Sequence, residues 1–263
     1  MKFNKIIYPI IASFLLVFTA CESIVEEDHL SNTNTVEGVQ LKAENTTQGG
    51  NEIKIEMLTP GITGHFNYII GKALTDRATI LFPVMGTFNF TYKGSLGAEL
   101  FEKKVAVTID KLDHPVPPEW GALLGTDAVA GKTWIFDQNG TPDNLWWFMS
   151  APNNPAGSMG AWWNAGGTCC PPSDANGKMH FDLNGDANYV HYENTSATGT
   201  KGTFILNPEG KTLTINDSKM LGYAAGNKDG VYTIVSLTAN KMVLYLNNNE
   251  TNGTGWTFVF RPE

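Results

Sequence analysis

The second half of the chain is a series of short strand-like segments separated by turn residues, and this pattern restricts the fold most strongly. The segments include 178–183, 189–193 and 202–206, and such a meander is typical of antiparallel β-structure. Asn184-Gly185 joins the first two segments and is the strongest short signal for a β-hairpin. Long helical periodicities are missing, and turn residues recur throughout. We therefore predict an all-β chain, with about nine strands after residue 126.

Two architectures fit a C-terminal domain at 126–263, namely a closed antiparallel β-barrel and a two-sheet β-sandwich. The runs GTFILNPEGKTLTIN, GVYTIVSLTANKMVLYL and WTFVF resemble the lipocalin-like domains of Bacteroidetes lipoproteins. That resemblance implies a barrel, while the strand pattern alone leaves both architectures open.

A first domain is expected at 52–112, ahead of a proline-rich hinge at 113–125. Residues 52–57 alternate as a strand should. The stretch PVMGTFNFTYKGSLGAELFEKKVAVTID resembles the second half of a PKD-like or immunoglobulin-like sandwich, although Met85 separates the proline from the glycine. Because this domain has neither tryptophan nor clustered acid–base residues, we interpret it as a rigid spacer. Three prolines within 115–118 stiffen the hinge.

The N-terminus predicts export. Lys2 and Lys5 precede an apolar run at 6–18 that is too short for a membrane-spanning helix, so residues 1–20 read as a signal peptide. Cys21 follows Thr19-Ala20, which resembles the lipobox of bacterial lipoproteins and implies acylation of Cys21. A plain cleaved signal with an incidental cysteine is the alternative.

Residues 21–51 are polar and predict a flexible tether. The acidic residues just after Cys21 resemble the surface-export signal of Bacteroidetes lipoproteins, which implies an outer-membrane lipoprotein exposed at the cell surface. The formal charge is −8 for the whole chain, and it becomes −10 once Lys2 and Lys5 are removed. A protein this acidic lacks the basic face that nucleic-acid binding requires, so we expect no nucleic-acid partner.

All seven tryptophans lie at or after position 120, and four form the pairs Trp146-Trp147 and Trp162-Trp163. Prolines and glycines separate the pairs, which predicts loops at the surface. An exposed indole is a flat apolar platform that suits the C–H face of a sugar ring. Carbohydrate binding is therefore the leading hypothesis.

Strand alternation assigns the individual tryptophans. We expect Trp147 to be buried and Trp146 to face outward, both members of Trp162-Trp163 to be exposed, and Trp120, Trp134 and Trp256 to be core residues. An alternative is that the whole cluster fills one end of a barrel. Polar partners for sugar hydroxyls are expected at Asn153, Asn154, Asn164 and Asp143.

Cys169-Cys170 has two interpretations. Adjacent Cα atoms are about 3.8 Å apart, below the usual disulfide range of about 4.4–6.8 Å. Export permits oxidation, and a vicinal disulfide would form a compact turn that supports Trp162-Trp163 or contacts a sugar. Two free buried thiols are the alternative.

The sequence gives only a weak metal signal. Asp182, Asn184 and Asp186 have the spacing of a calcium loop, but Ala187 replaces the required glycine and strands flank the segment. A plain hairpin explains the segment better. The histidines form no catalytic or ligand motif, so we expect neither a metal nor a cofactor.

The spacer, hinge and tryptophan-rich domain together resemble surface glycan-binding proteins of polysaccharide-utilisation loci. That resemblance implies binding of a polysaccharide without catalysis, implies a glycan-import complex as partner, and suggests a β-glucan as ligand. A glycoside hydrolase is the main rival, but it needs two poised carboxylates. The acids near the tryptophans, Asp137, Asp143 and Asp174, all lie in turn-like sequence. A lipocalin-like carrier with an apolar cavity and a purely structural lipoprotein are further alternatives.

Overall fold

The computed structural model describes residues 35–138, 145–153, 162–166, 169–247 and 253–263. The signal peptide, Cys21 and residues 21–34 of the predicted tether lie outside the described residues. Contacts within the chain separate a unit ending at Val39 from a unit of Gln40–Glu263. The described part of the first unit is a short 3-10 helix, η1 (Val36–Gly38), whose first turn is capped by Thr35. The second unit is all-β except for two short helices, which confirms the predicted class.

Folded structure begins earlier than predicted. Strand β1 (Leu41–Asn45) lies within the expected tether and pairs antiparallel with β2 (Glu52–Met57), with Ala43 opposite Ile55. None of the residues of β1 is fully buried. The tether prediction was therefore wrong for this segment, because its alternation is limited to two apolar residues, Leu41 and Ala43, within a polar stretch.

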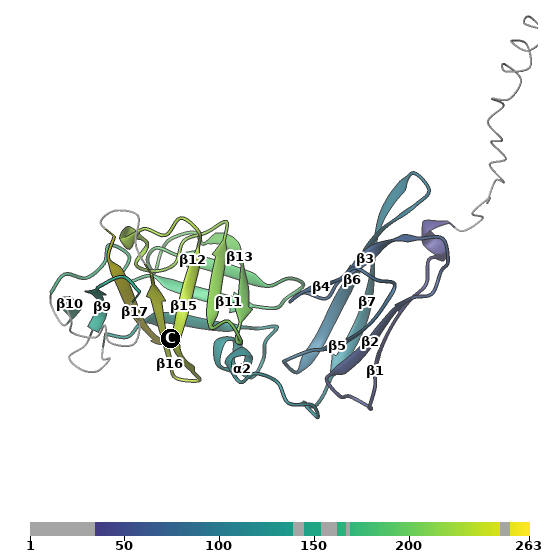
Figure 1. The fold of residues 1–263 in the computed structure, drawn as a ribbon, viewed down its shortest axis with the longest axis horizontal. Coiled ribbons are helices and arrows are strands. Elements are labelled where there is room, and N and C mark those ends of the chain that lie inside the picture. Colours follow the sequence, from purple (N-terminus) through teal and green to yellow (C-terminus); the bar gives the residue numbers. More distant parts are fainter. Residues whose placement is uncertain (1–34, 139–144, 154–161, 167–168, 248–252) are drawn as a thin grey trace, which may run out of the picture. The chain divides into compact units, whose positions relative to one another are not determined.

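The first domain consists of two antiparallel sheets, in agreement with the predicted sandwich. One sheet has the order β1-β2-β5 and the other has the order β4-β3-β6-β7 (Figure 1). Alternate residues of their strands are buried, including Ile53, Ile55, Phe88 and Phe90. The remaining strands are β3 (Thr63–Asn67), β4 (Lys72–Ala73), β5 (Arg77–Leu81), β6 (Gly86–Leu96) and β7 (Glu99–Ile109).

A buried amide joins the start of this domain to its end. Asn51 is fully buried, and its Nδ2 donates to the carbonyl oxygens of Phe82 (3.2 Å) and His114 (3.1 Å). Its Oδ1 accepts from the backbone N–H of His114 at 2.9 Å. Next to it, Asp113 accepts from the backbone N–H of Asn51 (3.1 Å) and from the hydroxyl of Thr47. These bonds fix residues 113–114 against the sandwich.

Asp113 makes the stability of this domain dependent on pH. The hydrogen bond from Thr47, helped by the backbone N–H of Asn51 and by His114, lowers the pKa of Asp113 from 3.8 to about 2. A carboxyl whose pKa is lower in the folded state stabilises the fold above its unfolded pKa, and that stabilisation is lost as the pH falls through the folded pKa. We expect the stability of the wild type to fall between about pH 4 and about pH 2 partly through this group.

The variant Asp113→Asn tests this prediction. Asp229→Asn is the control, because Asp229 is an exposed loop residue. Urea unfolding followed by far-UV circular dichroism, from pH 5 down to pH 2, should show a flatter pH dependence for Asp113→Asn only. An identical slope in the wild type and Asp113→Asn would contradict the assignment.

The predicted hinge is partly helical. Residues Glu119–Leu124 form helix α2, which ends at Gly125 with positive φ. Trp120, Leu123 and Leu124 are buried. The Leu123 carbonyl accepts from the indole N–H of Trp134 at 3.0 Å, and the Trp120 ring lies 6.4 Å from that of Phe204. The end of the proline-rich segment at 113–125 is therefore a helix, whose buried apolar side chains pack against the C-terminal domain.

Eight antiparallel strands of the C-terminal domain close into a barrel, which decides between the two predicted architectures. Pairing of β8 with β17, with Phe136 opposite Phe260, completes the closure. The strands are β8 (Lys132–Phe136), β11 (Lys178–Asp182), β12 (Asn188–Tyr192), β13 (Thr200–Asn207), β14 (Thr212–Asn216), β15 (Val231–Thr238), β16 (Lys241–Leu246) and β17 (Gly255–Pro262).

Two further strands extend the sheet past the barrel. Strand β9 (Leu145–Ser150) pairs with the first half of β17, next to the part that β8 occupies, and β10 (Trp163–Gly166) pairs with β9. Strand β10 is the outermost strand of this ten-stranded sheet. Figure 1 shows β9 and β10 beside β17.

The barrel has two distinct ends. We call the end closed by α2 the helix end; the turns at 183–187, 208–211 and 239–240 lie there. The opposite end, which we call the far end, holds the segments 171–177, 193–199 and 217–230, together with β9 and β10. The interior between the two ends is filled by large buried side chains, among them Trp134, Phe136, Phe181, Tyr189, Phe204, Tyr232, Phe258 and Phe260.

Candidate functional site

Three tryptophans from three neighbouring strands form a cluster at the far end. The ring of Trp147 on β9 packs at a tilt of 38° against that of Trp256 on β17, with 4.7 Å between the ring centres. Trp163 on β10 meets both of them edge-on, at 6.4 Å and 5.9 Å. Trp147 lies opposite Phe258 in the register, and register partners share a face of the sheet. The cluster therefore continues the aromatic interior of the barrel beyond its rim.

Cys169 and Cys170 form a vicinal disulfide at the end of β10. The Cys169 N–H donates to the Gly166 carbonyl at 2.9 Å, and the Cys170 carbonyl accepts from the indole N–H of Trp147 at 3.2 Å. Both cysteines are exposed, so of the two interpretations the structure has the disulfide and not buried thiols. The disulfide turn thereby provides the hydrogen-bond acceptor for the indole N–H of Trp147.

Trp162 and Asn164 are exposed in the segment that leads into β10. Trp162, which directly precedes the strand, is 58% exposed, and Asn164 within the strand is also exposed. An apolar platform and an amide with hydrogen-bonding capacity therefore lie two residues apart in the chain, at the edge of the sheet.

The remaining predicted partners are placed differently. The Asn153 N–H donates to Asn247 Oδ1 at 2.6 Å, and its Oδ1 accepts from Asn247 Nδ2 at 2.7 Å. Asn153 is therefore engaged in tying the segment after β9 to the end of β16. Asn154 and Asp143 lie outside the described residues.

Two of the tryptophan assignments were wrong. Trp146 was expected to face outward, but it is only 7% exposed and its ring lies 6.0 Å from that of Phe136. Phe148 and Ser150, on the face assigned to solvent, are also buried, so β9 is covered on both sides and alternation cannot separate its faces. Trp163 was expected to be exposed, but it is half-buried against the cluster. Trp120, Trp134, Trp147 and Trp256 are buried, as predicted.

In the acidic hairpin at 182–188, carboxylate oxygens accept hydrogen bonds from residues of the hairpin itself. Asp182 Oδ1 accepts from the N–H of Asn184 (2.8 Å) and from Asn188 Nδ2 (2.7 Å), and Asp186 Oδ1 accepts from the N–H of Ala187. These are turn-capping bonds. Within the ranges that the structure describes, no group of three or more His, Cys, Asp or Glu side chains is arranged to hold a metal ion.

Asp174 is a buried acid whose carboxylate is held by a hydrogen bond from the backbone. It is buried at the far end, where both carboxylate oxygens accept from the N–H of Gly222, at 3.0 and 2.9 Å. His191 Nε2, also buried, lies 3.6 Å from Asp174 Oδ2. Sequence reasoning placed Asp174 in a turn but missed His191 and Gly222, because their contacts span 17 and 48 residues of sequence.

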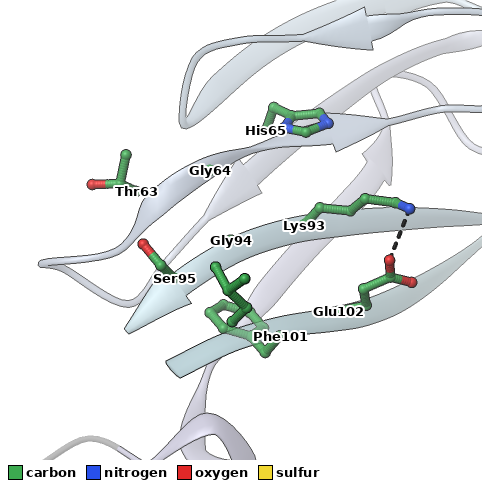
Figure 2. Close-up of a pocket in the computed structure, with 9 residues that line it drawn as sticks. Thr63, Gly64, His65, Lys93, Gly94, Ser95, Phe101 and Glu102 are labelled. Atoms are coloured by element: carbon green, nitrogen blue, oxygen red, sulfur yellow. Dashed lines mark ion pairs between the residues drawn. The ribbon is translucent and has the colours of Figure 1, made fainter. Parts of the chain in front are cut away.

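The first domain has a hollow of about 480 Å³ on its outer face, between β3, β6 and β7. Gly64 and Gly94 lie opposite each other there. Figure 2 shows Lys93 turned toward Glu102, to which it is bound at 2.8 Å. A side chain at either glycine would collide with the Tyr92 ring at 2.6 Å, so the glycines are explained by packing. Because this hollow lacks an exposed aromatic platform, we place the candidate site at Trp162.

No protein-family model matches the chain, and no curated protein is significantly similar to it. Among the helices that the structure describes, none has the length and hydropathy needed to cross a membrane.

Proposed function

We propose that the protein is a cell-surface lipoprotein that binds a polysaccharide without cleaving it and captures the glycan for degradation or uptake. The observation that carries this proposal is the exposed indole of Trp162, directly before the outermost strand β10 and near the exposed Asn164, beside the cluster of Trp147, Trp163 and Trp256. A large indole left in water by an otherwise well-packed barrel indicates a recognition surface.

Cys21 would carry the lipid that anchors the protein to the outer membrane, where it would serve a glycan-import complex. A β-glucan is the ligand class to test first. The carrier alternative is disfavoured because aromatic side chains fill the barrel interior. The hydrolase alternative needs two carboxylates facing the bond to be cleaved; of the acids that the sequence placed near the tryptophans, Asp174 is buried against Gly222.

Trp162→Ala should weaken polysaccharide binding by about 1–3 kcal/mol, roughly 5- to 150-fold, because the platform is removed. The free energy of unfolding should change by less than about 0.5 kcal/mol, since the residue is exposed. The measurement is native affinity electrophoresis of residues 22–263 through gels that contain plant, algal or fungal polysaccharides, with urea unfolding of the same samples.

Ile205→Ala is the matched control, because Ile205 is 57% exposed on β13. Retardation by one glycan that is lost in Trp162→Ala and kept in Ile205→Ala would support the proposal. Release of reducing sugar would move the assignment to a hydrolase. Equal retardation of the wild type and Trp162→Ala would show that Trp162 does not contribute to glycan binding.

A further inference from the structure

A polar cavity at the far end of the barrel contains functional groups that the polysaccharide surface does not use. Its volume is about 380 Å³. Its walls come from the end of β12, the turn at 193–199, the start of β13 and the segment 217–223. The groups that matter for recognition are His191, Glu193, Thr198, Thr200, Asp217, Ser218, Lys219 and Tyr223.

The walls of this cavity are held by bonds within the protein. Ser218 Oγ donates to the Thr200 carbonyl at 3.1 Å, and the buried Tyr189 hydroxyl donates to the Lys219 carbonyl at 2.7 Å. The Tyr223 hydroxyl donates to Glu193 Oε1 at 3.1 Å, and the Lys219 ammonium lies 4.2 Å from the centre of the Tyr223 ring. The cavity is therefore preorganised, which lowers the entropic cost of binding.

His191 contributes a buried imidazole to the wall of the cavity. The residue is only 4% exposed, and its Nε2 is buried without a hydrogen bond, 3.6 Å from the Asp174 carboxylate. Asp174 is in turn fixed by the N–H of Gly222. His191 therefore adds a group with hydrogen-bonding capacity to the cavity.

The chemistry of the walls restricts the ligand. An anion is disfavoured because Glu193 and Asp217 outnumber Lys219. A bare metal ion is disfavoured because no metal-holding group occurs among the described residues. An apolar ligand would leave the carboxylates and hydroxyls desolvated and unpaired. A neutral molecule with several hydroxyl groups satisfies carboxylate, ammonium, imidazole and hydroxyl groups together.

We propose that this cavity is a second ligand site that takes one neutral sugar ring, such as the end or a branch of a glycan. Carboxylates accept from sugar hydroxyls and Lys219 donates to them, while Tyr223 forms a side wall. The volume suits a single ring rather than a chain. This site is separate from the surface around Trp162, and either one can exist without the other.

The test uses the methyl glycosides of glucose, mannose, galactose and N-acetylglucosamine as probes, in saturation-transfer NMR with residues 22–263. We expect transfer to at least one of them. Glu193→Gln keeps the shape of the side chain and the bond from Tyr223 but removes the charge, so it should lower the affinity at least tenfold. Glu209→Gln, an exposed glutamate at the helix end, is the matched control and should bind like the wild type.

Trp162→Ala separates the two sites, because it should bind the glycoside normally while losing retention on polysaccharide. The ring ¹⁵N signals of His191, identified by their loss in His191→Gln, should shift on addition of the sugar. Absence of transfer to all four glycosides would overturn the inference. Transfer that is unchanged in Glu193→Gln, or lost in Trp162→Ala, would also overturn it.

Discussion

Trp147→Ala is expected to lower the free energy of unfolding by about 3–5 kcal/mol and to abolish polysaccharide binding. Trp147 is 9% exposed and contacts Trp163, Trp256 and Phe258. Its removal leaves a cavity among aromatic rings that cannot collapse into it. Trp163 loses its support, and the segment that presents Trp162 loses its fixed position. Urea unfolding monitored by tryptophan fluorescence and the affinity gel measure the two effects.

Trp147→Phe separates packing from hydrogen bonding. It keeps an aromatic ring but loses the indole N–H that binds the Cys170 carbonyl, which should cost about 1 kcal/mol for the bond in addition to the smaller ring. Trp162→Ala serves as the control that loses binding without loss of stability. If Trp147→Ala remains as stable as the wild type, the cluster does not support the site.

Asp174→Ala is expected to lower the free energy of unfolding by about 3 kcal/mol, because it leaves buried polar groups without a partner. The N–H of Gly222 loses its acceptor, and buried His191 loses the neighbouring carboxylate. Gly222 cannot rearrange freely, since it has a φ of +83° and any side chain there would meet the Phe258 ring at 2.6 Å. The loss should therefore appear as reduced stability of the whole barrel.

Urea unfolding of Asp174→Ala against Asp229→Ala measures this effect. Asp229 is exposed in the loop before β15, and its substitution should change the stability by less than about 0.5 kcal/mol. Asp174→Asn, which keeps an oxygen for Gly222, should fall between the two. Equal stability of Asp174→Ala and Asp229→Ala would show that the bond between the segment 171–177 and Gly222 is dispensable.

The regular parts of the fold could be predicted from local patterns. Strand-like sequence at 178–183 and 189–193, with Asn184-Gly185 between the two segments, identified a hairpin, and β11 and β12 pair around that turn. Period-two alternation reports one buried and one exposed face, which most strands of this barrel have. Period-two alternation does not identify the buried face of a strand that lacks one buried and one exposed face. Strand β1 buries neither face and was taken as tether, while β9 buries both and led to the wrong orientation of Trp146.

The candidate site could be located but not built from sequence. The two tryptophan pairs and Cys169-Cys170 indicated the segment that holds the candidate site, because Pro- and Gly-rich stretches rarely hold so many indoles. The partner of Trp147 and Trp163 is Trp256, which lies about a hundred residues further along the chain. Asn153 was assigned to a ligand, whereas the structure pairs it with Asn247 across the end of β16.

The all-β class, the turns and the location of the tryptophan-rich segment could be read from the sequence, because these follow from interactions between near neighbours in the chain. Tertiary packing was needed to show that the sheet closes through β8 and β17, that Trp162 is the exposed member of its pair, and that Asp174, His191 and Gly222 meet at the far end. Those outcomes depend on register and packing between residues far apart in sequence, and the free energy of such contacts leaves no periodic trace along the chain.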